Sequence, residues 1–437
     1  MLQVCFGGKI NHFLRGLPPE LTLELSRNFN SLRTNFVSYL VGNKDSSLPS
    51  HCFTSTSFGG IGFTKAKYMR DGAFLGSLKN FLFEFQNRYP VLWKTKDFLL
   101  HSPCAWLISL QNLIDSLDSN LWSDLFPVGV TEIQQRSIFS LPLCVRKLQK
   151  KFVLFHESLD FKNRISLAKT KSPAFCAFLN DISSSAASSF VSRLPRKFCF
   201  NLKDHEWLIN MRLRLGLWPS GLLKHSPCLC GRSKASNFHH LVNCHQFIHF
   251  RSIIHNSIRD TCLDMFKANG FHGKIEPLLA NLSDQPKVDR SRGDLIGPWL
   301  SCQEIIMDFT TVDPCNSRSI SKIFDDDFSA LEVAEKGKNT KYCHLINQLN
   351  VDRYNCFVFQ PFAMSINGNI GPAAQGFLTS FGKLCSEYGK VFNEYFWLSR
   401  LTFALLRSMH RYFNSILGKL FGDGQKDHSL DTLVSVC

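Results

Sequence analysis

Four potential metal ligands within 17 consecutive residues constrain the local fold more than any other feature of this sequence. Cys228 and Cys230 are followed at once by Gly231, and His240 and Cys244 come after eight further residues. Zinc takes four cysteine or histidine ligands in a tetrahedron, so a tight turn with two thiols can face a His/Cys pair one helical turn apart. The spacing predicts a structural zinc site, because four protein ligands leave no open coordination position.

Other histidines near this cluster leave the ligand set open. His239 also precedes Cys244 at a helix-compatible distance, so it competes with His240 as the third ligand. Because Cys-x-Cys is tighter than the common Cys-x2-4-Cys, the alternative interpretation is scattered buried thiols and surface histidines. Downstream, His255 is either a contact for metal or phosphate or a hydrogen-bonded helix histidine.

The remaining cysteines bear on the cellular compartment. The 16 cysteines are spread over 437 residues without the spacing of a disulfide framework. Residues 1–20 lack the apolar segment and cleavage site of a signal peptide, and no stretch reaches the ~18 apolar residues that span a bilayer. We therefore expect free thiols, no membrane association, and a nuclear or cytoplasmic protein that is not secreted.

Hydrophobic periodicity predicts an α+β multidomain protein. We expect a mainly helical, basic region at residues 1–190, a helix plus zinc-knuckle module at 191–275, and an α/β domain with C-terminal helices at 276–437. Helices are expected at Ala73–Phe85, Cys104–Leu117, Ser329–Lys341, Ala373–Glu387 and Tyr395–Leu417, and β-rich segments at Ile305–Val312 and Cys356–Gln360. Strands that alternate with helices imply a sheet covered on at least one face.

Positive charge is concentrated in the first part of the chain. Residues 1–250 carry 30 Lys and Arg against 15 Asp and Glu, so the whole net charge of +15 lies before residue 251. This distribution favours a nucleic-acid partner, although charge that serves only solubility gives the same composition. Arg212, Arg214 and Arg251 are the candidate phosphate contacts. For the first two, the alternative is a pair of solvated arginines on an amphipathic helix.

Two aspartates mark a second candidate site in the C-terminal third. Asp294 is followed after thirteen residues by Asp308, which lies inside the apolar strand Ile305–Phe309. A carboxylate among strand hydrophobics is costly unless a metal, a cation or a hydrogen-bond donor pairs with it. With Lys338 and Lys341 downstream, these residues form a set suited to phosphodiester hydrolysis with Mg²⁺ or Mn²⁺. The alternative is that both aspartates are structural residues at strand ends.

The order of these features resembles the C-terminal half of a non-LTR retrotransposon reverse transcriptase protein. In that family a zinc knuckle precedes a restriction-like endonuclease domain of the PD-(D/E)xK type. The resemblance covers about residues 195–385, and Lys9–Glu20 and the region from Gly59–Gly62 to Ser77 are more weakly similar to the family's thumb and linker. The ordered series is Arg212-Leu-Arg-Leu-Gly216, Cys-x-Cys-Gly, His-x3-Cys, His255-Asn256, Asp294, Asp308-Phe-Thr-Thr-Val-Asp-Pro314, Lys338-x2-Lys341-Tyr342 and Phe362…Gly368…Gly371.

The resemblance implies specific roles for the polar residues. Asp294 and Asp308 match the metal-binding aspartates, and Lys338 matches the catalytic lysine, with Lys341 as a substitute. In the plain nuclease motif a lysine stands two residues after the second aspartate, where this chain has Thr310. The family instead places this lysine on the following helix.

Two further positions and one missing region depart from the family's pattern. Gly293 stands where a proline usually precedes the first aspartate, and Ser365 stands where an acidic residue is often found. The fingers and palm of a polymerase, with their paired aspartates, have no counterpart before the thumb-like segment. We therefore expect a truncated or separately encoded fragment that does not polymerise nucleotides by itself.

The sequence thus predicts a Mg²⁺-dependent DNA endonuclease module that nicks target DNA for target-primed reverse transcription, with DNA and the element's RNA as partners. The alternative is a catalytically inactive, zinc-containing, nucleic-acid-binding remnant of a reverse transcriptase. A zinc-stabilised interaction protein without a nucleic-acid role is a third interpretation, which the placement of the positive charge disfavours.

Overall fold

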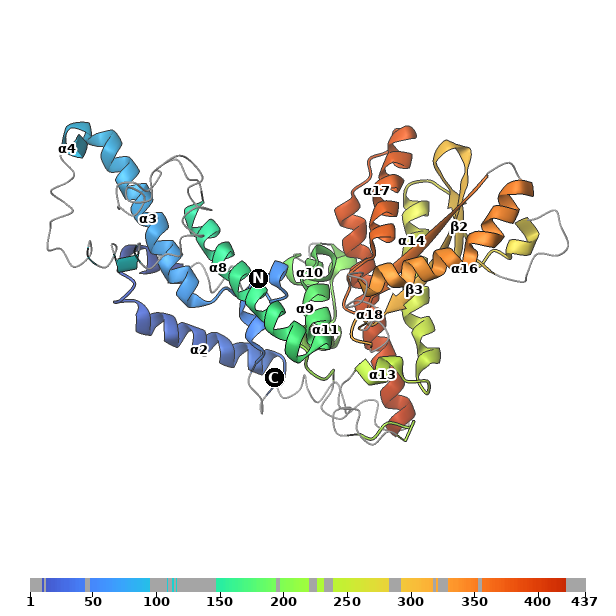
Figure 1. Ribbon diagram of the computed structural model, residues 1–437, viewed down its shortest axis with the longest axis horizontal. Coiled ribbons are helices and arrows are strands. Elements are labelled where there is room, and N and C mark those ends of the chain that lie inside the picture. The colour runs from blue at the N-terminus through green and yellow to red at the C-terminus, as the bar shows by residue number, and fades with distance from the viewer. Residues whose placement is uncertain are drawn as a thin grey trace. The chain divides into compact units, whose positions relative to one another are not determined.

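The computed structural model describes residues 10–11, 13–43, 48–94, 108, 112–113, 115, 147–193, 197–219, 226–231, 239–282, 292–316, 320, 329–352 and 356–421. Contacts divide the chain into two compact units, Met1–Ser166 and Leu167–Cys437. Every candidate site residue belongs to the second unit (Figure 1). The two units are described separately below.

The described part of the first unit is helical. Its long elements are α2 (Leu23–Leu40), α3 (Ala66–Arg88), the short α4 (Pro90–Lys94) and most of α8 (Leu148–Lys171). The glycine cluster between α2 and α3 forms a tight turn, in which Gly59 and Gly62 have φ angles of 79° and 88°. A Cβ atom on Gly60 would lie 2.1 Å from the carbonyl oxygen of Thr54, so only glycine fits this close approach.

A four-stranded mixed sheet organises the second unit. Its strands are β1 (Lys274–Ile275), β2 (Leu295–Pro298), β3 (Glu304–Val312) and β4 (Phe357–Ser365), in the order β1-β2-β3-β4. The first three pair antiparallel, whereas β3 and β4 are parallel, with Asp308 opposite Pro361. A parallel pair needs a crossover connection, and α16 (Ala330–Asp352) lies between these two strands in the chain.

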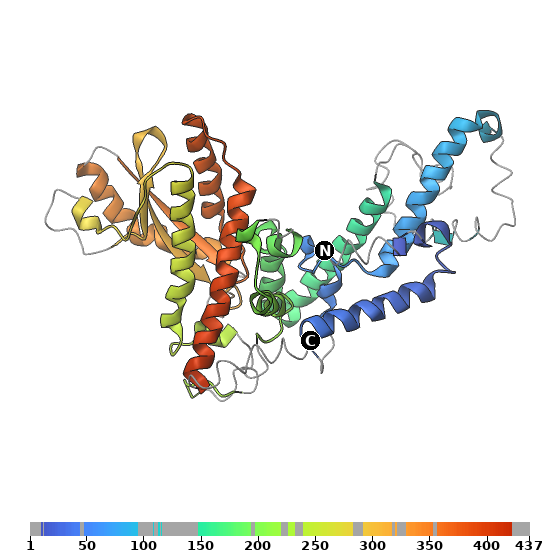
Figure 2. The ribbon, with the colours of Figure 1, turned by 180° about the vertical axis from the view of Figure 1, so that it is seen from behind.

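Helices cover both faces of the sheet. Alternate residues of β3 enter different cores, since Met307 and Phe309 belong to the larger buried cluster and Ile306 to the smaller one. Residues of α16 line the smaller cluster, and Figure 1 shows this helix beside the strands of the sheet. The larger cluster is filled by α14 (Arg251–Ala268), α17 (Pro372–Glu387) and α18 (Glu394–Phe421), and α14 and α18 lie side by side in Figure 2. Because side chains alternate along a strand, Asp308 shares the α16 face of the sheet with Ile306.

Shorter helices precede the sheet in the second unit. They are α9 (Pro173–Ile182), α10 (Ser185–Ser192), α11 (Asp204–Arg214) and α13 (His239–Asn243). Cys228, Leu241 and Phe309 belong to one buried cluster, so the cysteine/histidine segment shares a core with the sheet. Contacts therefore group residues 167–437 together, which differs from the three parts expected from the sequence.

The expected fold class agrees with the structure at the coarse level, since the protein is mostly helical with a small mixed sheet. The expected strand Ile305–Val312 and the helix at Tyr395–Leu417 correspond to β3 and α18, whose bounds differ by a few residues. Most of the expected helix Cys104–Leu117 lies outside the described residues. No helix in the described part of the chain is both long and apolar enough to span a lipid bilayer.

Candidate active site and metal centre

Neighbouring strands bring the two predicted aspartates together. Asp294 immediately precedes β2, and its backbone N–H donates to the carbonyl of Met307 in β3 at 2.9 Å. Its Oδ2 accepts the backbone N–H of Phe309 at 2.6 Å, directly beside Asp308. The antiparallel pairing of β2 with β3 thus fixes both aspartates at one place on the sheet.

Helix α16 supplies the partners of Asp308. The ammonium of Lys338 forms an ion pair with Oδ2 of Asp308, and the hydroxyl of Tyr342 donates to Oδ1 at 2.9 Å. Asp308 is only 5% exposed, so the ammonium of Lys338 and the hydroxyl of Tyr342 are what compensate its buried carboxylate. Burial raises the pKa of Tyr342, as do the charges of Asp308 and Asp294, so both carboxylates act on the same phenol.

The structure distinguishes the two lysines that the sequence offered. Lys338 reaches the carboxylate of Asp308, whereas the exposed Lys341 donates from Nζ to the hydroxyl of Tyr342 at 3.2 Å. Lys338, at i−4 from Tyr342, lies on the helix face that meets the sheet. Lys341 therefore reaches Asp308 only through the hydroxyl of Tyr342.

His255 holds the other aspartate. Its Nε2 lies 2.9 Å from Oδ2 of Asp294, and this hydrogen bond raises the pKa of His255 against the opposing effect of burial. Burial opposes ionisation of Asp294, but His255, the Phe309 N–H and the charge of Lys338 together lower its pKa. Of the interpretations left open for His255, the structure therefore favours a hydrogen-bonded histidine whose partner is a site carboxylate.

A residue that sequence reasoning missed, Glu335, joins the site to α17. Glu335 is buried and accepts the backbone N–H groups of Ala373 and Ala374 at 2.9 and 3.0 Å, at the beginning of α17. A Cβ atom on Gly371 would lie 2.2 Å from Oε1 of Glu335, so any larger residue there would displace this carboxylate from the N–H groups. The signal was its spacing, since Glu335 lies three residues before Lys338 on the same helix face.

The four predicted soft ligands converge. The Sγ atoms of Cys228 and Cys244 are 3.5 Å apart, and Sγ of Cys230 lies 3.3 Å from Nε2 of His240. All four ligand atoms lie within 4.8 Å of one another, and the three cysteines are free thiols. Burial raises the pKa of Cys228 to about 12, and the neighbouring thiols add to the effect. Because a bound cation is what stabilises thiolates in such a place, this cluster can hold a metal ion.

The structure also separates the two adjacent histidines. His240 points into the cysteine cluster, whereas Nδ1 of His239 lies 2.9 Å from Oδ1 of Asp313. Asp313 follows β3 and also accepts a hydrogen bond from Asn243. His240 is therefore the histidine of the cluster, and His239 ties the cluster's helix to the end of the sheet.

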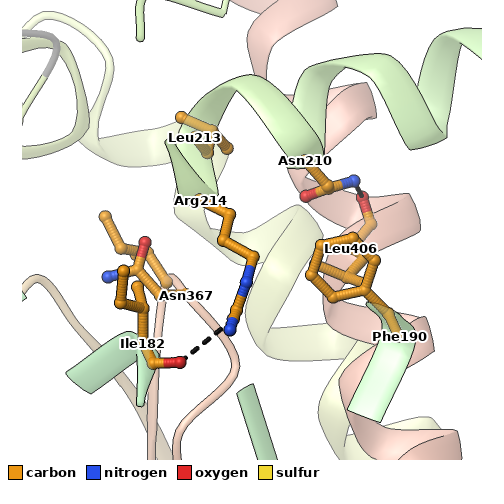
Figure 3. A pocket seen from close by; sticks show the side chains of 8 residues that line it. Ile182, Phe190, Asn210, Leu213, Arg214, Asn367 and Leu406 are labelled. Carbon is orange, nitrogen blue, oxygen red and sulfur yellow. Dashed lines mark hydrogen bonds between the residues drawn. The ribbon is translucent and has the colours of Figure 1, made fainter. Parts of the chain in front are cut away.

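The predicted phosphate-binding arginines are oriented inward. Arg214 is 3% exposed and donates to the carbonyls of Ile182 and Ala187 at 3.0 and 3.1 Å. Figure 3 shows its guanidinium beside Asn210 and Asn367 in a small pocket. Burial lowers the pKa of Arg214 to about 9, which marks a costly desolvation that backbone carbonyls offset.

The other two arginines also bind the chain's own carbonyls. Arg212 is 7% exposed, and its Nε donates to the carbonyl of Trp218 at 2.5 Å. Nε of Arg251 donates to Val242 at 3.1 Å, and its NH2 group donates to Oδ1 of Asn243 at 3.0 Å. The expectation of phosphate contacts was wrong for the buried Arg212 and Arg214, because a phosphate cannot reach a guanidinium that is not accessible to solvent.

Gly293 and Ser365, the two residues that differ from the pattern the sequence resembles, each have a local physical explanation. A Cβ atom on Gly293 would lie 2.8 Å from Cγ2 of Ile306, so the close approach of β3 favours glycine. Ser365, at the end of β4, donates from Oγ to Oδ2 of Asp181 at 2.7 Å, and Asn367 donates to the same oxygen at 2.8 Å. A carboxylate is therefore present at this place, but α9 supplies it.

Neither a family model nor a curated protein matches the chain. The functional argument therefore rests on the geometry of the site. That geometry combines two aspartates on neighbouring strands, an ammonium that contacts one of them and an imidazole that contacts the other. Groups of these types bind hard divalent cations and stabilise negative charge on phosphate.

Proposed function

We propose that the second unit is a Mg²⁺- or Mn²⁺-dependent endonuclease that nicks DNA, of the kind carried by non-LTR retrotransposon proteins. The observation that carries the proposal is the ion pair between Lys338 and Asp308, formed beside Asp294 on the neighbouring strand. A structural aspartate in a strand would need only a neutral donor or a single cation. Here two carboxylates share a site with two basic groups.

The donor set fits a hard divalent cation. Carboxylate oxygens are the ligands that Mg²⁺ prefers, and Asp294 and Asp308 would hold the ion. Oδ2 of Asp308 is buried and lies against the ammonium of Lys338, so positive charge already compensates this oxygen in the absence of a metal. When bound, the ion neutralises phosphate charge and lowers the pKa of its bound water.

The remaining residues orient and balance the carboxylates. Tyr342 fixes Oδ1 of Asp308, and His255 fixes Oδ2 of Asp294, so both ligands are held before substrate arrives. The side chain of Lys338 is 27% exposed, so a scissile phosphate can approach its positive charge. Lys338 is therefore the proposed catalytic lysine.

The cysteine/histidine cluster is proposed to hold zinc in a structural role. Cys228, Cys230, His240 and Cys244 supply four ligands, which closes the coordination sphere and leaves no position for substrate. The cluster belongs to the same core as the sheet, so its metal stiffens the nuclease unit. The basic residues of the first 250 positions are proposed to hold target DNA and the element's RNA through their phosphates.

The test is nicking of supercoiled plasmid by the full chain in the presence of Mg²⁺ or Mn²⁺. Wild type is compared with Asp308→Asn and with the matched control Asp264→Asn, which changes an aspartate of α14 that is 54% exposed. We expect nicking to fall about 10²-fold or more in Asp308→Asn, because a metal ligand is lost, and to be unchanged in the control.

Binding measurements make the outcome decisive. If wild type binds DNA with strong salt dependence but never cuts it with either ion, the catalytically inactive binding remnant is the better interpretation. Equal nicking by wild type and Asp308→Asn contradicts the assignment of the site. Thermal unfolding of each variant confirms that a lost activity is not a lost fold.

A further inference from the structure

Another group of metal-type ligands, made of residues that belong to neither site described above, lies between α11 and α18. His205 and Glu206 are in the first turn of α11, and His410 is in α18. One ligand atom from each lies within 4.8 Å of the other two. We propose that these three residues form a further metal site, which takes a borderline divalent cation of the zinc class and joins α11 to α18. This inference is independent of the proposed nuclease activity.

The chemistry of the donors fits such an ion. Two imidazoles and one carboxylate are a common three-residue zinc set, with water in the fourth position. In a tetrahedral site the ligand atoms are about 3.4 Å apart, so the present spacing needs only small side-chain movements to close. Mg²⁺ and Ca²⁺ are disfavoured, because both prefer oxygen ligands.

Packing holds the two rings where they are. The ring centroids of His205 and His410 are 4.4 Å apart with an angle of 32° between planes. The amide of Asn414, one turn later in α18, hydrogen-bonds Nε2 of His410 at 3.1 Å. The amide nitrogen donates this bond, which restricts rotation of the His410 ring; coordination through Nδ1 would require the amide to turn so that its oxygen accepts from Nε2–H.

The electrostatics at His410 favour a neutral ring, which is the form that binds a metal. Burial lowers the pKa of His410 to about 4, and the adjacent His205 adds to this effect. Lys203 and Arg411 contribute positive charge nearby, which opposes a bound cation, whereas Glu206 contributes a negative charge. The Glu206 carboxylate is buried, and its Oε2 accepts the backbone N–H of Lys203 at 2.9 Å, which fixes its position.

A metal here closes a long loop of the chain. Glu206 and His410 are separated by most of the second unit, including the sheet and the cysteine cluster. α11 and α18 already pack together, and Nδ2 of Asn210 donates to the carbonyl of Leu406 at 3.0 Å. An ion bound by both helices would therefore link α11, near the beginning of the second unit, to α18, near its end.

The experiment is a Co²⁺ titration of full-length protein from which metal has been removed with a chelator, carried out in a large excess of Mg²⁺ so that the proposed Asp294/Asp308 site does not take up cobalt. Bound ion per chain is counted by equilibrium dialysis, and visible spectra report the ligands, because thiolate ligands give intense charge-transfer bands that histidine and carboxylate do not. For wild type we expect two equivalents, of which only one produces the thiolate bands. We expect His205→Ala and Glu206→Gln to bind one equivalent and keep those bands unchanged.

Control variants make the result specific. His272→Ala removes an exposed histidine outside the cluster and should still bind two equivalents. Glu206→Gln keeps an oxygen that can accept the Lys203 N–H, so it separates loss of the ligand charge from loss of the helix cap. One equivalent in wild type, carried by the thiolates, overturns the proposal. Two equivalents in both site variants also overturn it, and circular dichroism verifies that each variant is folded.

Discussion

Two pairs of aspartates lie around the same strands; each pair has one imidazole partner, but only the first also has an ammonium. Asp294 and Asp308 contact the imidazole of His255 and the ammonium of Lys338. Asp181 and Asp313, at the far ends of β4 and β3, are held by hydroxyl, amide and imidazole groups and by a backbone N–H.

The two pairs also differ in the direction in which the pKa of an aspartate is shifted. Basic partners lower the pKa of Asp294 although burial opposes this, whereas burial raises the pKa of Asp181 to about 6 in spite of its hydrogen bonds. Aspartates at similar positions beside the sheet therefore have pKa values shifted in opposite directions. A carboxylate with basic partners stays ionised and can bind a cation, and one with mostly neutral partners serves as a hydrogen-bond acceptor within the fold.

The strongest test of this comparison removes the ammonium at the first pair. Under the proposed function, Lys338→Met lowers the rate of plasmid nicking about 10³-fold, because a positive charge near the scissile phosphate is lost. Lys341→Met, the matched control on the same helix, changes the rate only a few-fold, since Lys341 contacts Tyr342 and not a carboxylate. Similar losses in both variants contradict the assignment of Lys338.

The second test asks whether the soft-ligand cluster stabilises the unit that contains both pairs. Cys244→Ser removes a buried ligand, and we expect the free energy of unfolding to fall by about 3 kcal/mol, or roughly 6–12 °C in Tm. Removal of metal from wild type with a chelator has a comparable effect. Cys343→Ser changes an exposed thiol of α16 and leaves Tm unchanged, as measured by thermal unfolding.

The first aspartate pair and the cysteine cluster could be identified from short stretches of the sequence. Asp308 stood out because a carboxylate inside an apolar strand needs a partner, and a lysine on the helix that crosses between parallel strands is within reach of it. The cysteine cluster was equally readable, since its four ligands lie close in sequence.

The second aspartate pair could not be identified in this way, because it depends on contacts between segments that are distant in sequence. The hydroxyl that holds Asp181 comes from Ser365, 184 positions away, and the helix that carries Asp181 shows no unusual pattern. Arg214 failed as a predicted phosphate contact for the same reason, because its burial depends on α9 and α10, which precede it in the chain. Periodicity identifies a face of a helix, but it does not tell which element covers that face.

The third test uses pH at the second pair. Asp181 has a folded pKa of about 6, above the ~3.9 of an unfolded chain, so below pH 4 both states are protonated and ionisation costs nothing. Between about pH 4 and 6 the unfolded state loses its proton first, and wild-type stability falls by at most about 3 kcal/mol. Asp181→Asn lacks this loss.

The measurement is urea unfolding of wild type and Asp181→Asn across this pH range. We expect the wild-type free energy of unfolding, minus that of the variant, to decrease as pH rises from 4 to 6. Asp264→Asn, at an exposed position, should give a difference that does not change in this way. Parallel profiles for wild type and Asp181→Asn would mean that the neutral partners keep Asp181 ionised, and the contrast between the two pairs would disappear.

The smallest effect is expected at Glu335, which tests whether neutral partners suffice for a carboxylate beside the nuclease residues. Burial raises the pKa of Glu335, and its described partners are backbone N–H groups of Ala363 in β4 and of the first residues of α17. Glu335→Gln keeps one acceptor oxygen but turns an amide toward the N–H groups. The expected loss is about 1 kcal/mol in urea unfolding, roughly one hydrogen bond, with nicking nearly unchanged. Glu387→Gln, exposed at the other end of α17, should lose nothing. A large loss of nicking without a loss of stability would instead assign Glu335 to the metal site and extend the ionised pair to three carboxylates.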